Sequence, residues 1–257
     1  MLNHADPFPD RPGPVVVLLP AFPLDHRLWD DVAALLPAPL RPVAVDLPGL
    51  GSTAAGEPSL QVAVDGVVEL LDHLGAARAV VAGLSTGGYV AALLAGHAPD
   101  RVAALALCDT TTEVGPPDVP ADRLAVAADL EQHGIEVVLD SVAEGLGPHA
   151  GPELAGRVET MIRSQDPDDV AWVCRALAAR PDTSQAVRDF PGPVLLVFGE
   201  HDAPTPPAQR LAGLQELRPD AVALVVPGSG HLTALESPAA VAEALTTLAS
   251  QEQEQDV

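Results

Sequence analysis

The sequence contains no lysine: its 13 basic residues are all arginine and face 36 Asp and Glu residues, for a formal net charge of −23. Without lysine the chain cannot form a lysine Schiff base, anchor pyridoxal phosphate or build a Ser-Lys dyad. The phosphate-binding GxxxxGK[ST] loop is excluded for the same reason. The acidic balance also disfavours nucleic acids and anionic membranes as partners, because such a charge field repels both.

Cysteines, aromatic residues and long apolar runs are scarce too. Cys108 and Cys174 are too few for a disulfide scaffold or a zinc cluster, and no HExxH motif occurs, so we expect no metal. Aromatic residues make up 3% of the chain, but hydrophobic residues make up 47%, which is enough for one large globular core. No run can span a bilayer, and residues 1–14 do not resemble a signal peptide, so we expect a cytoplasmic protein.

Short apolar runs alternate with helical patterns along most of the chain. We expect strands at residues 15–19, 42–46, 79–84, 102–108, 194–198 and 221–226, and helices at 60–74, 87–96, 206–217 and 239–249. This alternation predicts an α/β fold, a mostly parallel sheet with helices on both faces. Between the fourth and fifth strands lie only helical patterns, at about 121–133, 135–145, 152–165 and 168–179. The sequence therefore predicts a core of 1–113 and 190–257, with an all-helical cap inserted at 114–189.

A GxSxG motif lies directly after the third predicted strand, as Gly83-Leu84-Ser85-Thr86-Gly87. By itself this pattern is weak evidence, and the alternative interpretation is a tight turn with an ordinary helix-capping serine. Its position between a buried strand and a helix is typical of a nucleophile elbow, in which a sharp turn exposes the serine. We therefore predict that Ser85 is a nucleophile.

A serine nucleophile needs a general base, and a carboxylate that orients the base. Among eight histidines, only His231 lies in a glycine-rich loop after the last predicted strand. Asp202 follows the end of the strand that begins at Val194. Asp109, at the end of the fourth strand, and Glu200 are weaker candidates for the acid, because the first is better explained as a turn cap and the second as a surface group.

Other polar residues near these motifs have simpler explanations. Asp46 is expected to support the turn at residues 49–52, and Asp25 and His26 belong to an exposed turn or contact a substrate. The glycines at 49 and 51 do not begin a dinucleotide loop, since residue 54 is alanine and no helix follows.

From residue 15 to residue 248 the chain resembles the α/β-hydrolase fold superfamily. The first evidence for the resemblance is the order Ser85, Asp202, His231 along the chain. Residues 19–25 and 46–52 are similar to the oxyanion loop and the D-x-x-G-x-G turn of that superfamily. Residues 98–102 and 228–238 also fit it. Residues 179–183 and 199–207 are similar to the 3-oxoadipate enol-lactonase-like and small-esterase group.

The resemblance also implies an oxyanion hole made of backbone N–H groups. The usual His-Gly after the first core strand is Pro20-Ala21 here. Because Pro23 has no N–H, we expect Phe22 and Thr86 to be the donors.

These features predict a cofactor-free serine hydrolase that acts on small carboxylic esters or lactones, using Ser85, Asp202 and His231. A perhydrolase or haloperoxidase, a C–C bond hydrolase, an acyltransferase or a non-catalytic ligand-binding protein of the same fold remain alternatives. Dehalogenase and epoxide hydrolase chemistry is disfavoured, because those relatives have Asp in place of Ser85. We expect the cap to exclude water and contribute nothing to the triad, with Met161 and Trp172 either in its core or on the pocket wall.

Overall fold

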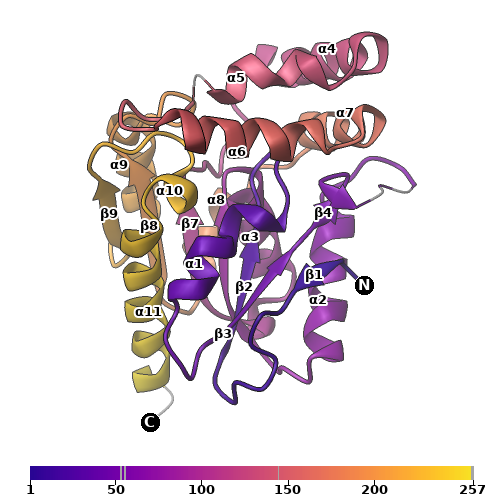
Figure 1. Ribbon diagram of the computed structural model, residues 1–257. Coiled ribbons are helices and arrows are strands. Elements are labelled where there is room, and N and C mark those ends of the chain that lie inside the picture. The colour runs from indigo at the N-terminus through magenta and orange to yellow at the C-terminus, as the bar shows by residue number, and fades with distance from the viewer. Residues whose placement is uncertain (53, 55, 144, 256–257) are drawn as a thin grey trace.

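A twisted, largely parallel sheet forms the centre of the molecule. The computed structural model of the chain describes residues 1–52, 54, 56–143 and 145–255. Within these residues seven strands form one sheet in the order β1-β3-β2-β6-β7-β8-β9 (Figure 1). Only β1 is antiparallel to its neighbour in that sheet. The strands are β1 His4–Ala5, β2 Val15–Leu19, β3 Arg41–Val45, β6 Ala79–Leu84, β7 Val102–Cys108, β8 Val194–Gly199 and β9 Val222–Val226, and a separate pair joins β4 Leu47–Pro48 to β5 Gly51–Ser52.

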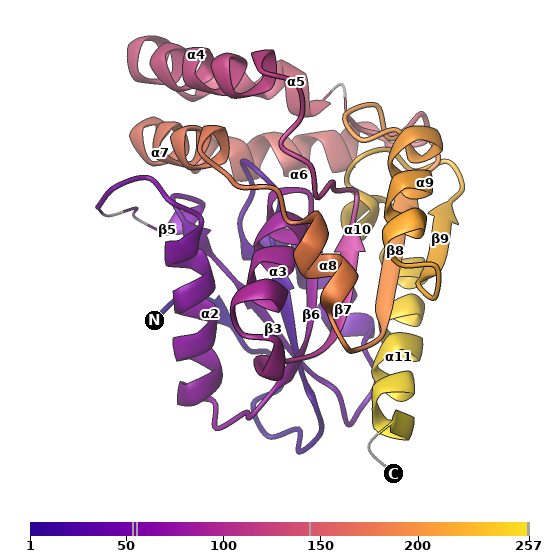
Figure 2. The same ribbon diagram turned by 180° about the vertical axis from the view of Figure 1, so that it is seen from behind.

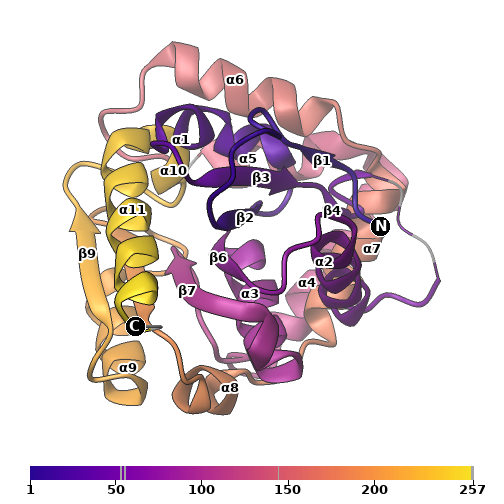
Figure 3. The same cartoon turned by 90° about the horizontal axis from the view of Figure 1, so that it is seen from below.

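Helices cover both faces of the sheet, as the sequence predicts. α1 and α11 lie on one face, and α2 and α3 lie on the other (Figures 1 and 3). The central strands are apolar throughout because successive side chains enter different cores: Val16 and Leu18 join the first, and Val17 and Leu19 the second. The elements are η1 His26–Trp29, α1 Asp30–Leu35, α2 Gln61–His73, α3 Thr86–His97, η2 Pro99–Arg101, α9 Pro207–Leu217, α10 Thr233–Glu236 and α11 Pro238–Gln255. None of the described helices combines the length and hydropathy needed to cross a membrane.

In its described residues, the segment between β7 and β8 contributes helices and no strand. Its elements are α4 Asp118–His133, η3 Ile135–Val138, α5 Leu139–Ala143, α6 Pro152–Arg163, α7 Pro167–Ala178 and α8 Ser184–Asp189. α4 to α7 lie above one end of the sheet, with α4 packed on α7 (Figures 1 and 2). α8 differs from the expected cap, because it packs beside the sheet on α3 (Figure 2). A Cβ on Gly96 of α3 would lie 2.7 Å from the Cβ of Ala186, so glycine permits this close approach.

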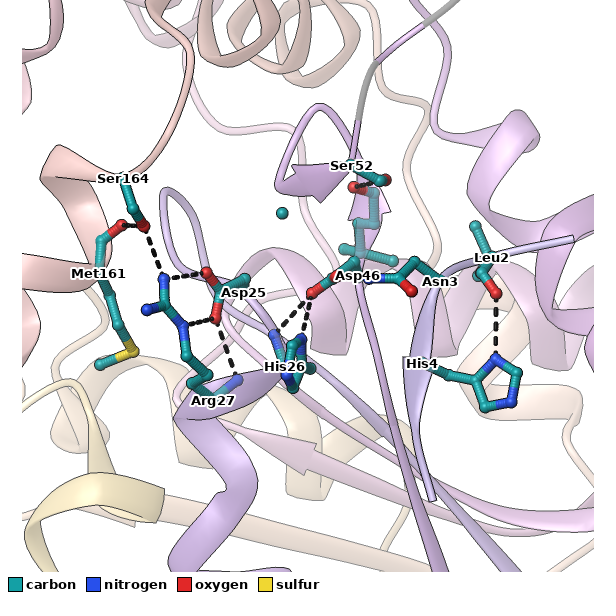
Figure 4. A network of polar contacts seen from close by, with 12 residues as sticks. Leu2, Asn3, His4, Asp25, His26, Arg27, Asp46, Ser52, Met161 and Ser164 are labelled. Carbon is teal, nitrogen blue, oxygen red and sulfur yellow. Dashed lines mark hydrogen bonds and ion pairs between the residues drawn. The ribbon is translucent and has the colours of Figure 1, made fainter. Parts of the chain in front are cut away.

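A polar network joins the cap to the loop that follows β2. It consists of Asp25, His26, Arg27, Asp46 and Gln165, and Figure 4 shows most of it. Both oxygens of the buried Asp25 carboxylate accept hydrogen bonds from the Arg27 guanidinium, at 2.8 and 2.6 Å. Asp46 accepts from the backbone N–H of His26 at 2.9 Å and lies 2.8 Å from its Nδ1. Gln165, which follows α6, donates to Asp25 at 2.9 Å and accepts from the Gly51 N–H at 2.7 Å.

The electrostatics of this network favour a structural role. Burial alone would raise the pKa of Asp25, but the hydrogen bonds and charge of Arg27 outweigh burial and hold that pKa below its usual range. The hydrogen bond to Asp46 raises the pKa of His26. Asp25, His26 and Asp46 offer potential metal-ligand atoms within 4.8 Å of one another, yet Arg27 already supplies the positive charge that Asp25 requires. The network holds the loop after β2, the turn at Gly51 and the cap together, so Asp25 and His26 are parts of the scaffold.

We expect Gln165→Leu to lower the free energy of unfolding by about 1–3 kcal/mol, because it leaves the Gly51 N–H without its partner and removes a bond to Asp25. Chemical denaturation at neutral pH measures the change. Gln185→Leu is the matched control, since the exposed Gln185 bonds only to neighbours on α8, and it should stay within about 0.5 kcal/mol of the parent. Equal stability of the two variants would contradict a structural role for the network.

Candidate active site

Three adjacent parallel strands end together at the edge of the sheet below the cap. Leu84 at the end of β6 is in register with Cys108 of β7, and Cys108 is in register with Val197 of β8. The residues that follow these strands, Ser85, Asp109 and the loop to Asp202, are therefore neighbours. In open α/β sheets, ligands bind beyond the carboxyl ends of the strands.

Ser85 occupies the sharp turn between β6 and α3. Its backbone has φ +53° and ψ −111°, a conformation that a non-glycine residue adopts only when its surroundings impose it. The Ser85 N–H donates to Cys108 O at 2.8 Å, and Thr110 Oγ1 donates to Ser85 O at 2.7 Å. A Cβ at position 83 would lie 2.1 Å from Gly87 O, and a Cβ at position 87 would lie 2.2 Å from Leu19 O, so the turn closes only with glycine at both positions. This is the strand–turn–helix geometry of a nucleophile elbow.

The structure brings Ser85, His231 and Asp202 into one hydrogen-bonded chain. His231 Nε2 lies 3.0 Å from Ser85 Oγ, and His231 Nδ1 lies 2.9 Å from Asp202 Oδ1. Both distances are within hydrogen-bond range, and the two ring nitrogens face different partners. The arrangement can accept a proton from Ser85 on one side of the imidazole while the carboxylate holds the other side.

Asp202 is held as a carboxylate by its other contacts. It is buried, and burial alone would raise its pKa, but hydrogen bonds from His231 and Thr205 and the charge of His231 outweigh burial and lower the pKa. The Thr205 N–H donates to Asp202 Oδ1 at 2.8 Å, and the Thr205 hydroxyl donates to Oδ2. The acceptor that orients His231 is therefore ionised at neutral pH. Thr205 was not singled out from the sequence, although it lies three residues after Asp202.

Asp109, the alternative acid, binds other partners. Its Oδ1 accepts from the Gly199 N–H at 2.8 Å, and its Oδ2 accepts from the Thr233 N–H and hydroxyl at 3.3 and 2.5 Å. Complete burial, together with the nearby charge of Asp202, raises the pKa of Asp109 well above its usual range. Asp109 thus ties the loop after β8 to the loop that carries His231. Glu200, the other alternative, is exposed and accepts from the Gly228 N–H at 2.9 Å.

The cap contributes directly to the position of His231, contrary to the sequence-based expectation. The His231 N–H donates to Gly145 O in the loop between α5 and α6, at 2.7 Å. Glu236 accepts from the N–H groups of Gly230 at 3.0 Å, Leu232 at 3.1 Å and Gly147 at 2.8 Å. Glu236 therefore fixes the histidine loop and the cap loop against each other. In the sequence it stands out only as part of the motif at 228–238.

The predicted oxyanion donors come from two separate segments, the start of α3 and the loop after β2. Thr86 is the buried first residue of α3, and Phe22 lies half-buried in the loop after β2, packed against both hydrophobic cores. Neither the Phe22 N–H nor the Thr86 N–H donates a hydrogen bond to another residue in the described part of the chain. An oxyanion requires unpaired backbone donors beside the nucleophile, and Thr86 lies directly after Ser85 at the start of α3.

A cavity of about 200 Å³ opens above Ser85 and His231. Tyr89, Thr110, Thr205, Val114 and Val119 contribute to its wall, together with three arginines that the sequence analysis did not single out, Arg123, Arg180 and Arg210.

Met161 and Trp172, considered for this wall, are not among its residues. Met161, on α6, is buried in the first hydrophobic core. The Trp172 indole N–H donates at 2.9 Å to Gly56 O, in the loop between β5 and α2. The sequence left open whether they lie in the core of the cap or on the pocket wall.

Comparisons with known proteins agree with this geometry. A family model described as the alpha/beta hydrolase family matches residues 16–244. The chain is 31% identical over 208 residues to the pimeloyl-[acyl-carrier protein] methyl ester esterase of Neisseria meningitidis, covering 75% of this chain and 77% of that protein. It is also 31% identical over 240 residues to the dihydrolipoyllysine-residue acetyltransferase component of the acetoin cleaving system of Pseudomonas putida. That match includes 88% of this chain but only 60% of the relative's length.

Solved structures extend the match to nearly the whole chain. A thermophilic esterase from Thermogutta terrifontis, solved with malate bound, superposes with a TM-score of 0.91 at 29% identity, covering 98% of this chain and 93% of that one. The enol-lactonase from Burkholderia xenovorans LB400 has the same fold, with a TM-score of 0.86 at 24% identity and coverage of 97% and 96%. The predicted fold and the resemblance are thus confirmed, and the chain belongs to the alpha/beta hydrolase family.

Proposed function

We propose that the protein is a cofactor-free serine hydrolase that cleaves small carboxylic esters or lactones through an acyl-enzyme. The observation that carries this proposal is the hydrogen-bonded chain from Ser85 through His231 to Asp202 at the end of a strained elbow. Its relatives include proteins named as esterases, which supports ester chemistry.

In the first half of the proposed reaction, Ser85 Oγ attacks the substrate carbonyl while His231 Nε2 takes the hydroxyl proton. Asp202 accepts a hydrogen bond from Nδ1–H and stabilises the imidazolium as it forms. The carbonyl oxygen becomes an oxyanion that the N–H groups of Phe22 and Thr86 bind, each worth about 2.7–4 kcal/mol in the transition state. The carbon–oxygen bond to the alcohol then breaks, and His231 returns the proton to the leaving alkoxide.

In the second half, water replaces the alcohol. His231 removes a proton from a water molecule that attacks the acyl-enzyme, and the same two N–H groups hold the second oxyanion. Collapse of this intermediate releases the carboxylic acid, and Ser85 recovers its proton from His231. With a lactone, the alcohol released in the first half stays attached to the acyl chain, so one hydroxy acid leaves.

The alternatives differ in what attacks the acyl-enzyme or in whether it forms. A perhydrolase would pass the acyl group to hydrogen peroxide, an acyltransferase would pass it to another alcohol, thiol or amine, and a ligand-binding member of the fold would show no burst of alcohol. Measuring the initial burst and the product acid with and without such acceptors separates these possibilities.

We expect Ser85→Ala to lower kcat on 4-nitrophenyl acetate by several orders of magnitude, since losing the nucleophile of a triad costs on the order of 10⁶-fold. Fluorophosphonate labelling should be lost in the same variant. Ser250→Ala, which removes an exposed hydroxyl on α11 bonded to Thr246 O, is the control and should retain both activity and labelling. If Ser85→Ala kept more than about 1% of kcat, Ser85 would not be the nucleophile.

Asp202→Asn should lower kcat by about 10⁴-fold, because an amide at this position favours the wrong tautomer of His231. Asp109→Asn should lower kcat much less, since Asp109 bonds to Gly199 and Thr233 instead of the imidazole. Steady-state kinetics on one ester, with circular dichroism to check folding, compares the two variants. A larger loss in Asp109→Asn would move the acid of the triad to the end of β7.

A further inference from the structure

The cavity above Ser85 has an excess of positive charge. Arg123 comes from α4, Arg180 from the segment after α7, and Arg210 from α9, so three separate segments bring a guanidinium to the same small space. Among the described residues that line the wall, the only carboxylate belongs to Glu113, which pairs with Arg210 at 2.8 Å. The excess is therefore two positive charges, in a protein whose formal net charge is −23.

Arg123 and Arg180 lack the carboxylate partner that most arginines of this chain have. Within the described residues neither forms an ion pair, although carboxylates are abundant. The arginines that do pair with a carboxylate are Arg27, Arg41, Arg101, Arg157, Arg163, Arg175, Arg210 and Arg218. In such an acidic protein, two arginines without an ion pair beside the candidate nucleophile remain available to bind an anion.

The surroundings of the two unpaired guanidinium groups hold them in place but do not neutralise them. Arg180 lies over the Tyr89 ring, 4.7 Å from its centre, and donates weakly to the carbonyl oxygens of Glu113 and Val114 at 3.3 and 3.4 Å. Arg123 lies over the ring of Phe22, 5.4 Å from its centre. Aromatic faces attract a cation and leave its N–H groups free to bind an anion.

Unsatisfied N–H donors and repulsion among the three guanidinium groups indicate that the cavity lacks an anion. The Nε–H groups of Arg180 and Arg210 are buried and have no hydrogen-bond acceptor among the described residues. Burial lowers the pKa of Arg180, and the positive charges of Arg123 and Arg210 lower it further. Because arginine stays protonated in proteins, this repulsion persists until an anion enters the cavity.

We propose that Arg123, Arg180 and Arg210 form a carboxylate-binding subsite, and that the preferred substrates are small esters or lactones that carry a second, free carboxylate. Guanidinium groups bind a planar carboxylate through paired hydrogen bonds, which fixes its direction as well as its charge. The proposal rests on the proposed function, because Ser85 must still attack the ester carbonyl.

The size of the cavity limits the substrate. Its volume of about 200 Å³ is below the range of about 300–1,000 Å³ typical of sites for drug-sized ligands. The free carboxylate and the reacting ester must therefore be separated by a short chain. Half-esters of four- to six-carbon dicarboxylic acids have this form and make suitable probes.

The test compares monoethyl and diethyl esters of succinate, glutarate and adipate, with hydrolysis followed by acid release at neutral pH. We expect kcat/KM for the best half-ester to exceed that of its diester at least 10-fold, after correction for the two ester groups of the diester. In Arg123→Met and in Arg180→Met that ratio should fall about 10-fold or more, mainly through KM. Arg188→Met, which removes an exposed guanidinium on α8, is the charge-matched control and should leave the ratio unchanged.

The outcomes separate the subsite from the proposed function. A wild-type ratio near one, or a ratio that neither Arg123→Met nor Arg180→Met changes, would overturn the subsite while hydrolysis of the diesters upheld the function. If no ester were hydrolysed, the proposed function would fail, and calorimetric titration of glutarate into the Ser85→Ala protein would still decide the subsite. If adding Arg123→Met to the Ser85→Ala protein weakens glutarate binding about 10-fold, the subsite is supported. If glutarate binding is undetectable, or equal in the two proteins, the subsite is overturned.

Discussion

The site depends on the fixed register of three parallel strands, β6, β7 and β8. Since Leu84, Cys108 and Val197 lie side by side, the residues that follow them must share one small volume. The peptide N–H of Ser85 bonds back to Cys108, and that of Asp109 to Val197, so each strand end is held by the next strand. This mutual support sustains a left-handed conformation at Ser85 that would otherwise cost of order 1–3 kcal/mol.

The parts of the molecule that were predictable from the sequence are those in which one local pattern has one structural meaning. Strands buried on both faces read as unbroken apolar runs, so β2, β6 and β7 have the expected bounds. Ser85 is identifiable because its motif lies at a strand–helix junction, and Asp202 and His231 because the family fixes their order. None of these inferences needed knowledge of a distant contact.

The remaining features depend on contacts between distant segments, which no local pattern encodes. The sequence does not decide whether Met161 lies in the core or on the pocket wall, and the position of α8 on α3 depends on a close approach at Gly96. Arg123, Arg180 and Arg210 are ordinary arginines in the sequence, and only folding makes them neighbours.

The cap is attached to the core at two places that matter for the proposed chemistry. At one end Gln165 bonds to Asp25 and to the turn at Gly51, and at the other Gly145 accepts from the His231 N–H. A cap that swung away as a rigid body would break both attachments, leave buried polar groups unpaired and release the histidine loop. Substrate entry by small local movements is therefore favoured over wide opening, which agrees with a cavity that suits only small molecules.

The charges of the proposed subsite and of the whole molecule act over different distances. A formal charge of −23 repels an anionic substrate during its approach, but at physiological salt this repulsion fades over about 8 Å. Inside the cavity an anion lies close to the unpaired Arg123 and Arg180. There the attraction of the two arginines for the anion exceeds the screened repulsion from the acidic surface. The acidic surface would then slow the encounter with an anion, while the arginines would decide whether it stays bound and where its ester lies relative to Ser85. Hydrolysis of a half-ester turns one carboxylate into two, so the acidic surface repels the doubly charged product more strongly than the substrate, which favours release of the product acid.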